Sequence, residues 1–331
     1  MQSPVIPGHM VFYKNKPVTG TFYEEVVRGL TAPQKYLDSK YFYDVTGDQL
    51  FQQIMQCHEY YLTGCEMEIL TTRAAEITDA ITRQAGTFDV VELGAGDATK
   101  SIHLLRQLLT SEVDFTYFPI DISANVIRHL EQELPAALPD LQLKGLNGEY
   151  FGMLQAANTY SRKKKVVLFL GANIGNFDPA AAHSFCEELR ELLQPGDLLL
   201  TGFDLKKHPQ VILHAYNDDA GITKAFNLNL LTRINRELGA NFDLSKFEHY
   251  PTYDPGTGAC KSYLISLENQ QVKIGDNVYI DFAENEPLYM EISQKYSLEE
   301  TEQLALQAGF KPVARFFDSK KWFVDCLWQC D

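Results

Sequence analysis

The stretch from Val90 to Lys100 carries the pattern in this sequence that best indicates a ligand site. An apolar run leads to Glu92, and Gly94 and Gly96 follow with one residue between them. Glycine lets the backbone turn tightly and approach a ligand that a Cβ atom would keep away. In an open α/β sheet, such a turn at the carboxyl end of a parallel strand is where nucleotide-like ligands bind. We therefore expect a nucleoside cofactor here, against the alternative of a strand-to-helix turn that binds nothing.

The residue at position 99 helps to distinguish between the possible nucleoside cofactors. The dinucleotide fingerprint requires a third glycine three residues after the second, and Thr99 stands there. Methyltransferases that use S-adenosylmethionine (SAM) tend instead to carry an acidic residue two positions before the first glycine, where Glu92 lies. The pattern therefore favours SAM. An NAD oxidoreductase ranks lower, because no histidine or lysine site for hydride transfer is evident.

Three later segments place polar groups beside the same turn. Asp121 ends the next apolar run and is a candidate ligand of the ribose hydroxyls, with a helix N-cap or a surface carboxylate as the alternative. Residues 147–150 follow the third run and offer hydrogen bonds and an aromatic ring for adenine, and residues 171–177 follow the fourth. Because loops after successive parallel strands meet at one edge of a sheet, we expect these segments to converge.

Glu291 and Ser293 are two residues apart in a predicted strand, so they share one face of it. Together they can accept from and donate to a small polar ring such as imidazole, although a solvated strand face is the commoner origin of such a pair. Tyrosines also cluster early in the chain, where they can serve a site or the core. These are Tyr41, Tyr43, Tyr60 and Tyr61.

The order of elements predicts an α/β fold: a doubly wound, mostly parallel, Rossmann-like sheet with right-handed crossovers. The expected strands are Phe88–Leu93, Phe115–Ile120, Leu141–Gly145, Val166–Leu170 and Asp197–Phe203. The expected helices between them are Thr99–Thr110, Ala124–Glu133, Gly152–Ala157 and Ala180–Leu193. Upstream, Thr63 is a candidate N-cap for one long helix over Cys65–Thr82.

The flanking segments predict additional domains. Residues 1–62 form an arm and short helices that contribute to a substrate pocket, and 63–205 form the SAM-binding core. Residues 206–295 form a substrate-binding insert or lid, helical over Gln210–Leu238 and strand-rich over Phe247–Ser293. Residues 296–331 add a last helix and two strands, Lys311–Asp318 and Trp322–Trp328.

Composition excludes several classes of protein. The net charge of −15 argues against a nucleic-acid partner, because such proteins concentrate Lys and Arg. No apolar run approaches the roughly 20 residues that span a bilayer, so no membrane partner is expected. The six cysteines lack a CxxC pair and no signal segment is evident, which predicts a cytoplasmic protein with reduced thiols. The eight histidines show no metal-binding spacing, so we expect no metal.

An ordered set of motifs resembles the SAM-dependent histidine Nα-methyltransferases of ergothioneine biosynthesis, a family that includes relatives acting on tryptophan derivatives. The resemblance runs from Thr21 to Trp328. Its motifs are Tyr41–Asp44, Glu59–Tyr61, Val91–Gly96, Phe169–Asn176, Gly202–Lys206, Ala215–Asp218, Asn229–Leu238 and Glu291–Ser293. The resemblance implies an enzyme that methylates the α-amine of L-histidine up to the trimethylated betaine, hercynine, and releases S-adenosylhomocysteine. We expect this enzyme to be a monomer.

The resemblance also implies roles for single residues. Asn176 and Tyr216 match the family's ligands of the substrate carboxylate, and Glu291 and Ser293 match its ligands of the imidazole.

Tyr43 and Tyr60 match two tyrosines around the amino group, and Tyr43 is the candidate catalytic group. The implied cofactor contacts are Gly94, Lys100, Asp121, Glu149 and Tyr150, in addition to Glu92 and Gly96 from the glycine turn.

Several positions depart from the family pattern. Leu62 and Gly64 replace a common Pro and Arg, Glu149 replaces the usual Asp, and a basic residue expected at Leu228 is missing. The segment Lys261–Leu264 is also unlike the histidine enzymes. The substrate therefore has an alternative, tryptophan or another aromatic amino acid, and a SAM-binding protein without activity is the alternative from another class.

Overall fold

The computed structural model describes residues 21–331, which divide into two compact units. The parallel-sheet unit comprises 62–175, 182–206 and 295–331, and the antiparallel unit comprises 21–61, 176–181 and 207–294. Most of the arm expected over residues 1–21 lies outside the described residues. The two units are described separately below.

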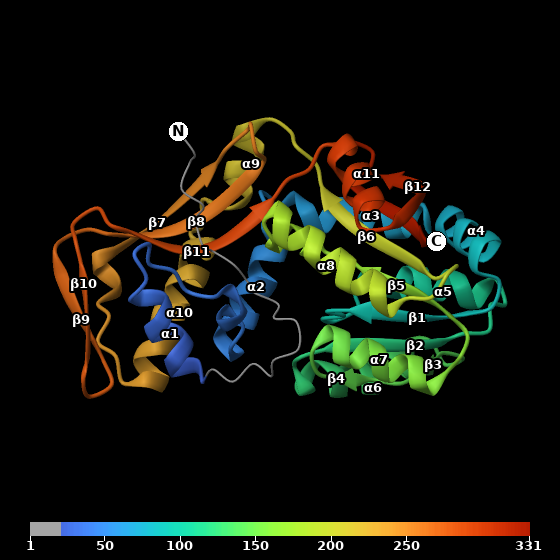
Figure 1. Cartoon of the computed structure of the whole chain (residues 1–331), viewed down its shortest axis with the longest axis horizontal. Coiled ribbons are helices and arrows are strands. Elements are labelled where there is room, and N and C mark those ends of the chain that lie inside the picture. Colours follow the sequence, from blue (N-terminus) through green and yellow to red (C-terminus); the bar gives the residue numbers. More distant parts are fainter. Residues whose placement is uncertain (1–20) are drawn as a thin grey trace. The chain divides into compact units, whose positions relative to one another are not determined.

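The parallel-sheet unit is built on one mainly parallel sheet (Figure 1). The strand order is β12-β13-β6-β5-β1-β2-β3, with β4 also paired to β2, and β13 runs antiparallel to both β6 and β12. The strands are β1 (Phe88–Leu93), β2 (Thr116–Asp121), β3 (Gln142–Leu143), β4 (Leu146–Asn147), β5 (Lys164–Phe169), β6 (Leu198–Asp204), β12 (Phe310–Phe317) and β13 (Phe323–Cys330). Every residue of β1 is buried, as expected for a central strand that is covered on both faces.

The helices of this unit follow from its strand order. Right-handed crossovers place the helices that link β1, β2 and β3 on one face, and those that lead back to β5 and β6 on the other. These helices are α3 (Tyr61–Thr72), α4 (Ala74–Ala85), α5 (Ser101–Thr110), α6 (Ala124–Ala137), α7 (Tyr150–Tyr160), α8 (Pro179–Leu192) and α11 (Leu298–Gln307). The α/β class with a doubly wound sheet is thus confirmed.

Two details of the prediction were wrong. Helix α3 begins at Tyr61, so Thr63 lies inside it, and the expected long helix is broken at Arg73. The side chains of Thr71 and Thr72 donate to backbone carbonyls of the preceding turn, a contact that weakens a helix.

The expected strand Leu141–Gly145 is instead the pair of two-residue strands β3 and β4. The strand is interrupted because the backbone at Gly145 passes close to α6. A Cβ at Gly145 would come within 2.5 Å of Ile127 Cγ2.

The antiparallel unit combines helices with two small sheets, ordered β11-β8-β7 and β10-β9. Strand β8 alternates half-buried and buried residues along its length, so one face of that sheet packs on the core. Its elements are α1 (Phe22–Leu30), η1 (Ser39–Phe42), α2 (Val45–Gln56), α9 (Pro209–Ala215), α10 (Ile222–Leu238), η3 (Leu244–Lys246), β7 (Phe247–Tyr253), β8 (Ala259–Ser266), β9 (Gln270–Ile274), β10 (Val278–Phe282) and β11 (Pro287–Gln294).

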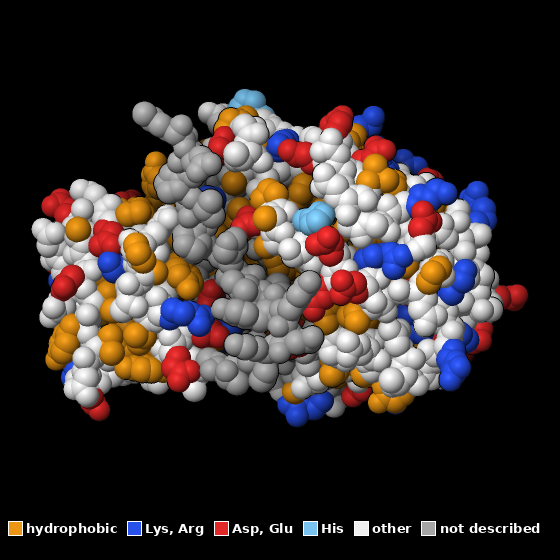
Figure 2. All heavy atoms as spheres, in the orientation of Figure 1, with side chains coloured by type: hydrophobic (Ala, Val, Ile, Leu, Met, Phe, Trp, Pro, Cys, Tyr) orange, Lys and Arg blue, Asp and Glu red, His pale blue; other side chains and the backbone are white. Residues whose placement is uncertain are grey.

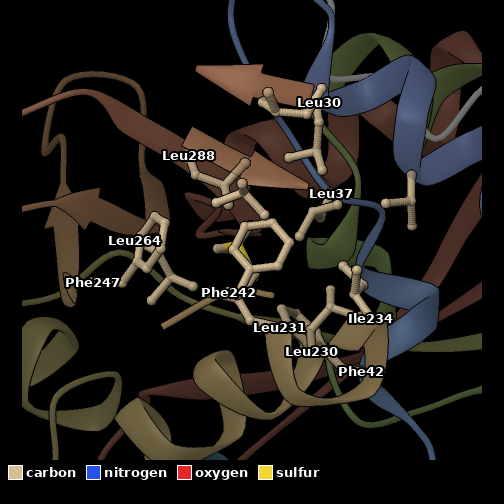
Figure 3. Packing of buried hydrophobic residues seen from close by; sticks show 14 of the residues in the cluster. Leu30, Leu37, Phe42, Leu230, Leu231, Ile234, Phe242, Phe247, Leu264 and Leu288 are labelled. Carbon is tan, nitrogen blue, oxygen red and sulfur yellow. The ribbon is translucent and has the colours of Figure 1, made fainter. Parts of the chain in front are cut away.

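One apolar cluster holds the antiparallel unit together (Figure 3). Leu30 and Phe42 from the first helices meet Leu230 and Ile234 of α10, and all four side chains are almost fully buried. Leu264 of β8 belongs to the same cluster. Burying each such side chain contributes roughly 1.5–3 kcal/mol, so α10 is fixed against both the sheet and the N-terminal helices.

The surface carries charges of both signs. Figure 2 shows acidic and basic side chains interspersed on the face that it draws. Among residues 21–331, no helix has the length and apolar character needed to cross a membrane. The same residues contain no group of three or more His, Cys, Asp or Glu arranged to hold a metal ion.

Candidate active site

The glycine turn lies at the carboxyl end of β1 in the parallel-sheet unit. Gly94 and Gly96 have φ angles of +71° and +54°, which residues other than glycine rarely adopt. The turn is fastened to the end of β2, because Gly94 N donates to Ile120 O over 2.9 Å and Gly96 N donates to Asp121 Oδ2 over 3.3 Å. Asp121 also accepts from Ser123 N, and burial raises the pKa of its carboxyl. The structure therefore brings the predicted cofactor turn and the predicted ribose ligand together.

The polar groups around Gly94 and Gly171 form a cradle that packs closely on both glycines. A Cβ at Gly94 would come within 2.8 Å of the Tyr150 hydroxyl and 3.5 Å of Asn173 Nδ2. A Cβ at Gly171, after β5, would come within 3.5 Å of Lys100 Nζ. Polar groups from the ends of β1 and β5 and from α7 thus converge where only glycine fits, which suits the polar parts of a nucleoside cofactor.

Lys100, at the start of α5, is paired with Glu66 of α3. Glu66 is fully buried, and both of its carboxylate oxygens accept from Gly171 N, over 2.7 and 2.9 Å. Burial lowers the pKa of Lys100, but the nearby charge of Glu66 outweighs this and raises it overall. Lys100 is therefore a charged group that can attract the carboxylate of a ligand.

The other two predicted cofactor residues lie differently. Glu92 points into the core, where it accepts a hydrogen bond from Tyr117, and burial raises the pKa of its carboxyl to about 7. Glu149 is exposed and occupies the N-cap position of α7, directly before Tyr150. Burial raises the pKa of Tyr150 above its usual range, so this phenol stays neutral.

The predicted substrate residues all belong to the antiparallel unit, and four of its aromatic rings form a row. Tyr43 lies edge-on to Phe51 with ring centroids 5.6 Å apart, and Phe51 lies 6.5 Å from Tyr60. Tyr60 is edge-on to Tyr216 at 6.1 Å. Phe226 of α10 packs against both Tyr43 and Phe51, at 5.8 and 5.9 Å. Two early tyrosines, Tyr43 and Tyr60, are thus held in one aromatic row with the distant Tyr216.

The row continues to the predicted imidazole ligands. Tyr216 Oη donates to Ser293 Oγ over 2.6 Å, and the backbone oxygen of Tyr216 accepts from His249 Nε2 over 2.9 Å. Glu291 pairs with Ser262 of β8 in an unbroken register with Ser293, so Glu291 and Ser293 lie on the same face of β11. A β-bulge interrupts the pairing just before Glu291.

Asn176 is the last residue of η2 (Asn173–Asn176) and is exposed. It follows the turn after β5 and belongs to the antiparallel unit, like the other predicted substrate residues. Its amide offers both a donor and an acceptor to a ligand.

Comparison with known proteins identifies the family. The sequence profile of the family described as histidine-specific, SAM-dependent methyltransferases matches residues 22–330. The chain belongs to this family. A histidine N-alpha-methyltransferase of Mycolicibacterium smegmatis is 37% identical over 288 residues, which cover 87% of this chain and 88% of that protein. The histidine N-alpha-methyltransferase of Mycobacterium tuberculosis is 33% identical over 273 residues, 82% of this chain and 83% of that protein.

A relative with another substrate in its name also matches. The L-tryptophan methyltransferase of Psilocybe serbica is 27% identical over 330 residues, which cover 91% of this chain and 90% of that protein. For a histidine-specific, SAM-dependent methyltransferase, the cradle around Gly94, Lys100 and Tyr150 is the part of the chain suited to SAM. Bound SAM supplies a methyl group on a sulfonium sulfur, which becomes a neutral thioether when that methyl is transferred.

Several residues around the site of this methyltransferase escaped sequence reasoning. Glu66 carries only a weak signal, a carboxylate on the otherwise apolar buried face of α3. Asn173 lies in a motif that was recognised, but only Asn176 was assigned from it. Phe51, Phe226 and His249 have no local signal, because their contacts in or beside the aromatic row join distant segments.

Proposed function

We propose that this protein transfers methyl groups from SAM to the α-amino group of L-histidine, up to the trimethylated betaine. Belonging to the histidine-specific family carries this proposal. The monomeric state and the cytoplasmic location stay predictions from the sequence.

The arrangement of the antiparallel unit supports this substrate. The hydrogen bond from Tyr216 to Ser293 joins a candidate ligand of the carboxylate to a candidate ligand of the ring. Histidine carries those two groups a few bonds apart, with the α-amine between them. We assign Asn176 and Tyr216 to the carboxylate, and Glu291 with Ser293 to the two ring nitrogens, of which one donates and one accepts.

Tyr43 and Tyr60 are assigned to the amine. The ammonium form has no lone pair, so it must lose one proton before each attack on the methyl carbon. Each transfer forms an N–C bond and leaves the electron pair of the C–S bond on sulfur. We assign the Tyr43 hydroxyl to accepting the hydrogen bond of the amine and passing its proton to solvent, since Tyr43 is 48% exposed. The protein otherwise acts by aligning the amine with the methyl group.

As methyl groups accumulate, the amine becomes a fixed cation. The faces of Tyr43 and Tyr60 are electron-rich and can accept such a cation without a hydrogen bond. This suits a product that no longer donates one.

A competition assay tests the proposal. The protein is incubated with isotopically labelled SAM and equal concentrations of all amino acids, and the products are identified by mass. We expect labelled mono-, di- and trimethylhistidine. Labelling of a different amino acid would overturn the substrate assignment, and no labelling despite measurable binding of S-adenosylhomocysteine would indicate the inactive binding protein.

Tryptophan is the second candidate substrate, because the L-tryptophan methyltransferase named above matches nearly the whole chain. An indole has one N–H and no second ring nitrogen, so it makes little use of a paired carboxylate and hydroxyl. In a direct competition between the two amino acids, Glu291→Ala should reduce histidine methylation much more than any tryptophan methylation. Equal reduction of both would argue against contact between Glu291 and imidazole.

A further inference from the structure

Three residues of the family motifs, Asp44, Asn229 and Arg236, have no role in the site as assembled. Asp44 closes the Tyr41–Asp44 motif, and Asn229 and Arg236 belong to the Asn229–Leu238 motif almost 200 residues later. The structure brings the two motifs together in the antiparallel unit, directly beside Tyr43.

Tyr43 sits at the centre of a very tight turn. Its φ and ψ angles are −88° and 69°, and Asp44 N donates to Phe42 O over 3.1 Å, which defines an inverse γ-turn. The carbonyl of Phe42 then points at Gly47, where a Cβ atom would lie only 1.8 Å from the carbonyl oxygen. Glycine is therefore the residue that lets this turn close against the first turn of α2.

Asp44 holds the turn from its other side. Its Oδ1 accepts from Gly47 N and from Asn229 Nδ2, each over 2.8 Å, and its Oδ2 accepts from Arg236 Nη2 over 2.6 Å. Burial alone would raise the pKa of Asp44, but these three hydrogen bonds lower it below its usual range. The carboxylate is thus charged, and it joins the N-terminus of α2 to α10.

One face of α10 contacts the whole motif. Phe226, Asn229, Arg233 and Arg236 are spaced by three or four residues, so they lie along one side of the helix. Arg233 Nη1 donates to Tyr41 O over 2.9 Å, and the Phe226 ring lies 4.8 Å from that of Phe42. Figure 3 shows Phe42 among the side chains of α10.

We propose that this face of α10, through Asn229 and Arg236 acting on Asp44, is a clamp that positions the Tyr43 hydroxyl for methyl transfer. Asp44, Asn229 and Arg236 are positioning residues and touch no substrate atom. The inference rests on the proposed function, because it assumes that Tyr43 acts on the amine.

The clamp explains how an exposed side chain can be placed accurately. The Tyr43 ring packs against Phe51 and Phe226, yet nearly half of its surface is open to solvent, so the position of its hydroxyl also depends on the backbone. The backbone on both sides of Tyr43 is fixed. Phe42 is buried in the core, and Asp44 is hydrogen-bonded to Asn229 and Arg236 of α10. A displacement of about 1 Å at a reacting group can cost on the order of a hundredfold in rate.

Kinetics of single and paired variants test the clamp. We expect Asp44→Asn and Asn229→Ala to lower kcat by about ten- to a hundredfold, while KM for histidine and Kd for S-adenosylhomocysteine stay within about twofold. Arg236→Ala, which removes a half-exposed side chain, should lower kcat by about threefold or more. Lys224→Ala removes another exposed cation from α10 and should leave all three quantities unchanged.

The decisive arm is a double-mutant cycle. If Asp44 acts through Tyr43, then adding Asp44→Asn to Tyr43→Phe should lower kcat by less than about twofold more. Losses that multiply, or a rise in KM and Kd as large as the fall in kcat, would overturn the clamp and leave Asp44 with a general structural role.

Amide hydrogen exchange keeps the test independent of the proposed function. The Asp44 and Gly47 amides should exchange faster in Asn229→Ala and Arg236→Ala than in the wild type or in Lys224→Ala. If the wild type methylates no histidine but this exchange pattern is found, the proposed function fails and the clamp on the turn stands. If exchange is unchanged, the clamp fails whatever the substrate.

Discussion

Tyr216 donates its hydroxyl hydrogen to Ser293 Oγ over 2.6 Å, across 77 residues of sequence. The bond is buried and lies in the antiparallel unit, so it does not exchange readily with water. It makes the two ends of the proposed substrate site energetically dependent on each other, because moving one side chain leaves the other without this partner.

The bond predicts non-additive effects on histidine binding. Tyr216→Phe and Ser293→Ala should each raise KM for histidine, and the double variant should raise it by less than the product of the two factors. A coupling of about 1 kcal/mol is expected for one buried neutral hydrogen bond. The measurement is steady-state kinetics of the four proteins at saturating SAM. Strictly multiplicative factors would show that the two residues act independently.

Gly94 and Gly96 make a matched pair for testing the cofactor cradle. Both have positive φ, so alanine strains the backbone at either position, by roughly 1 kcal/mol. A Cβ at Gly94 would in addition come within 2.8 Å of the Tyr150 hydroxyl, whereas a Cβ at Gly96 meets no atom within 4 Å among the described residues. We expect Gly94→Ala to weaken S-adenosylhomocysteine binding by about tenfold more than Gly96→Ala, measured by calorimetry. Similar losses would mean that the close packing of Gly94 on Tyr150 has no part in cofactor binding.

The sheet and the cofactor turn could be predicted because their signals are local. Short apolar runs alternate with helical patterns over residues 88–203, and this order alone fixes the fold class. The bounds of β1 agree with the prediction, since a strand buried on both faces is apolar throughout. The glycines before α5 mark the turn because backbone with positive φ selects that residue.

The clamp and the links within the aromatic row could not be predicted, because they depend on contacts between distant segments. Asp44 is 185 residues from Asn229 and 192 from Arg236, and no pattern in either segment predicts a contact with the other. The break at Arg73 was missed for a different reason. The apolar pattern continues through it, and only the threonine hydroxyls bonded to the backbone distinguish the two helices.

Glu92 predicts a loss of stability as the pH rises. Burial raises its pKa in the folded state to about 7, above the value of 4.5 that an exposed glutamate has. Between these two values the folded state binds the proton more tightly, so the free energy of unfolding should fall as the pH rises from 4.5 through 7. Glu92→Gln removes the titrating carboxyl. The free energy of unfolding of this variant, relative to that of the wild type, should rise by roughly 3 kcal/mol from pH 4.5 to 7. Urea unfolding at several pH values without ligand measures it, and a constant difference would show that Glu92 stays ionised.

His249 predicts the opposite dependence. Burial lowers its pKa, and its Nε2 must carry a hydrogen because the Tyr216 carbonyl can only accept. The folded state therefore favours the neutral ring, and the unfolded state binds more protons below a pH of about 6.5. The stability that this histidine contributes is present above that pH and is lost as the pH falls towards the folded-state pKa.

His249→Gln separates the titration of the histidine from the loss of its hydrogen bond, because the glutamine amide can still donate to the Tyr216 carbonyl. We expect the free energy of unfolding of the variant to fall less steeply than that of the wild type between pH 6.5 and 5. The Tyr216 backbone should stay in place in the glutamine variant, so KM for histidine should change little at pH 7.5, whereas His249→Ala should raise it by removing the donor. An identical pH dependence in His249→Gln and the wild type would show that the folded and unfolded states bind this proton equally, and burial would then not control the ring.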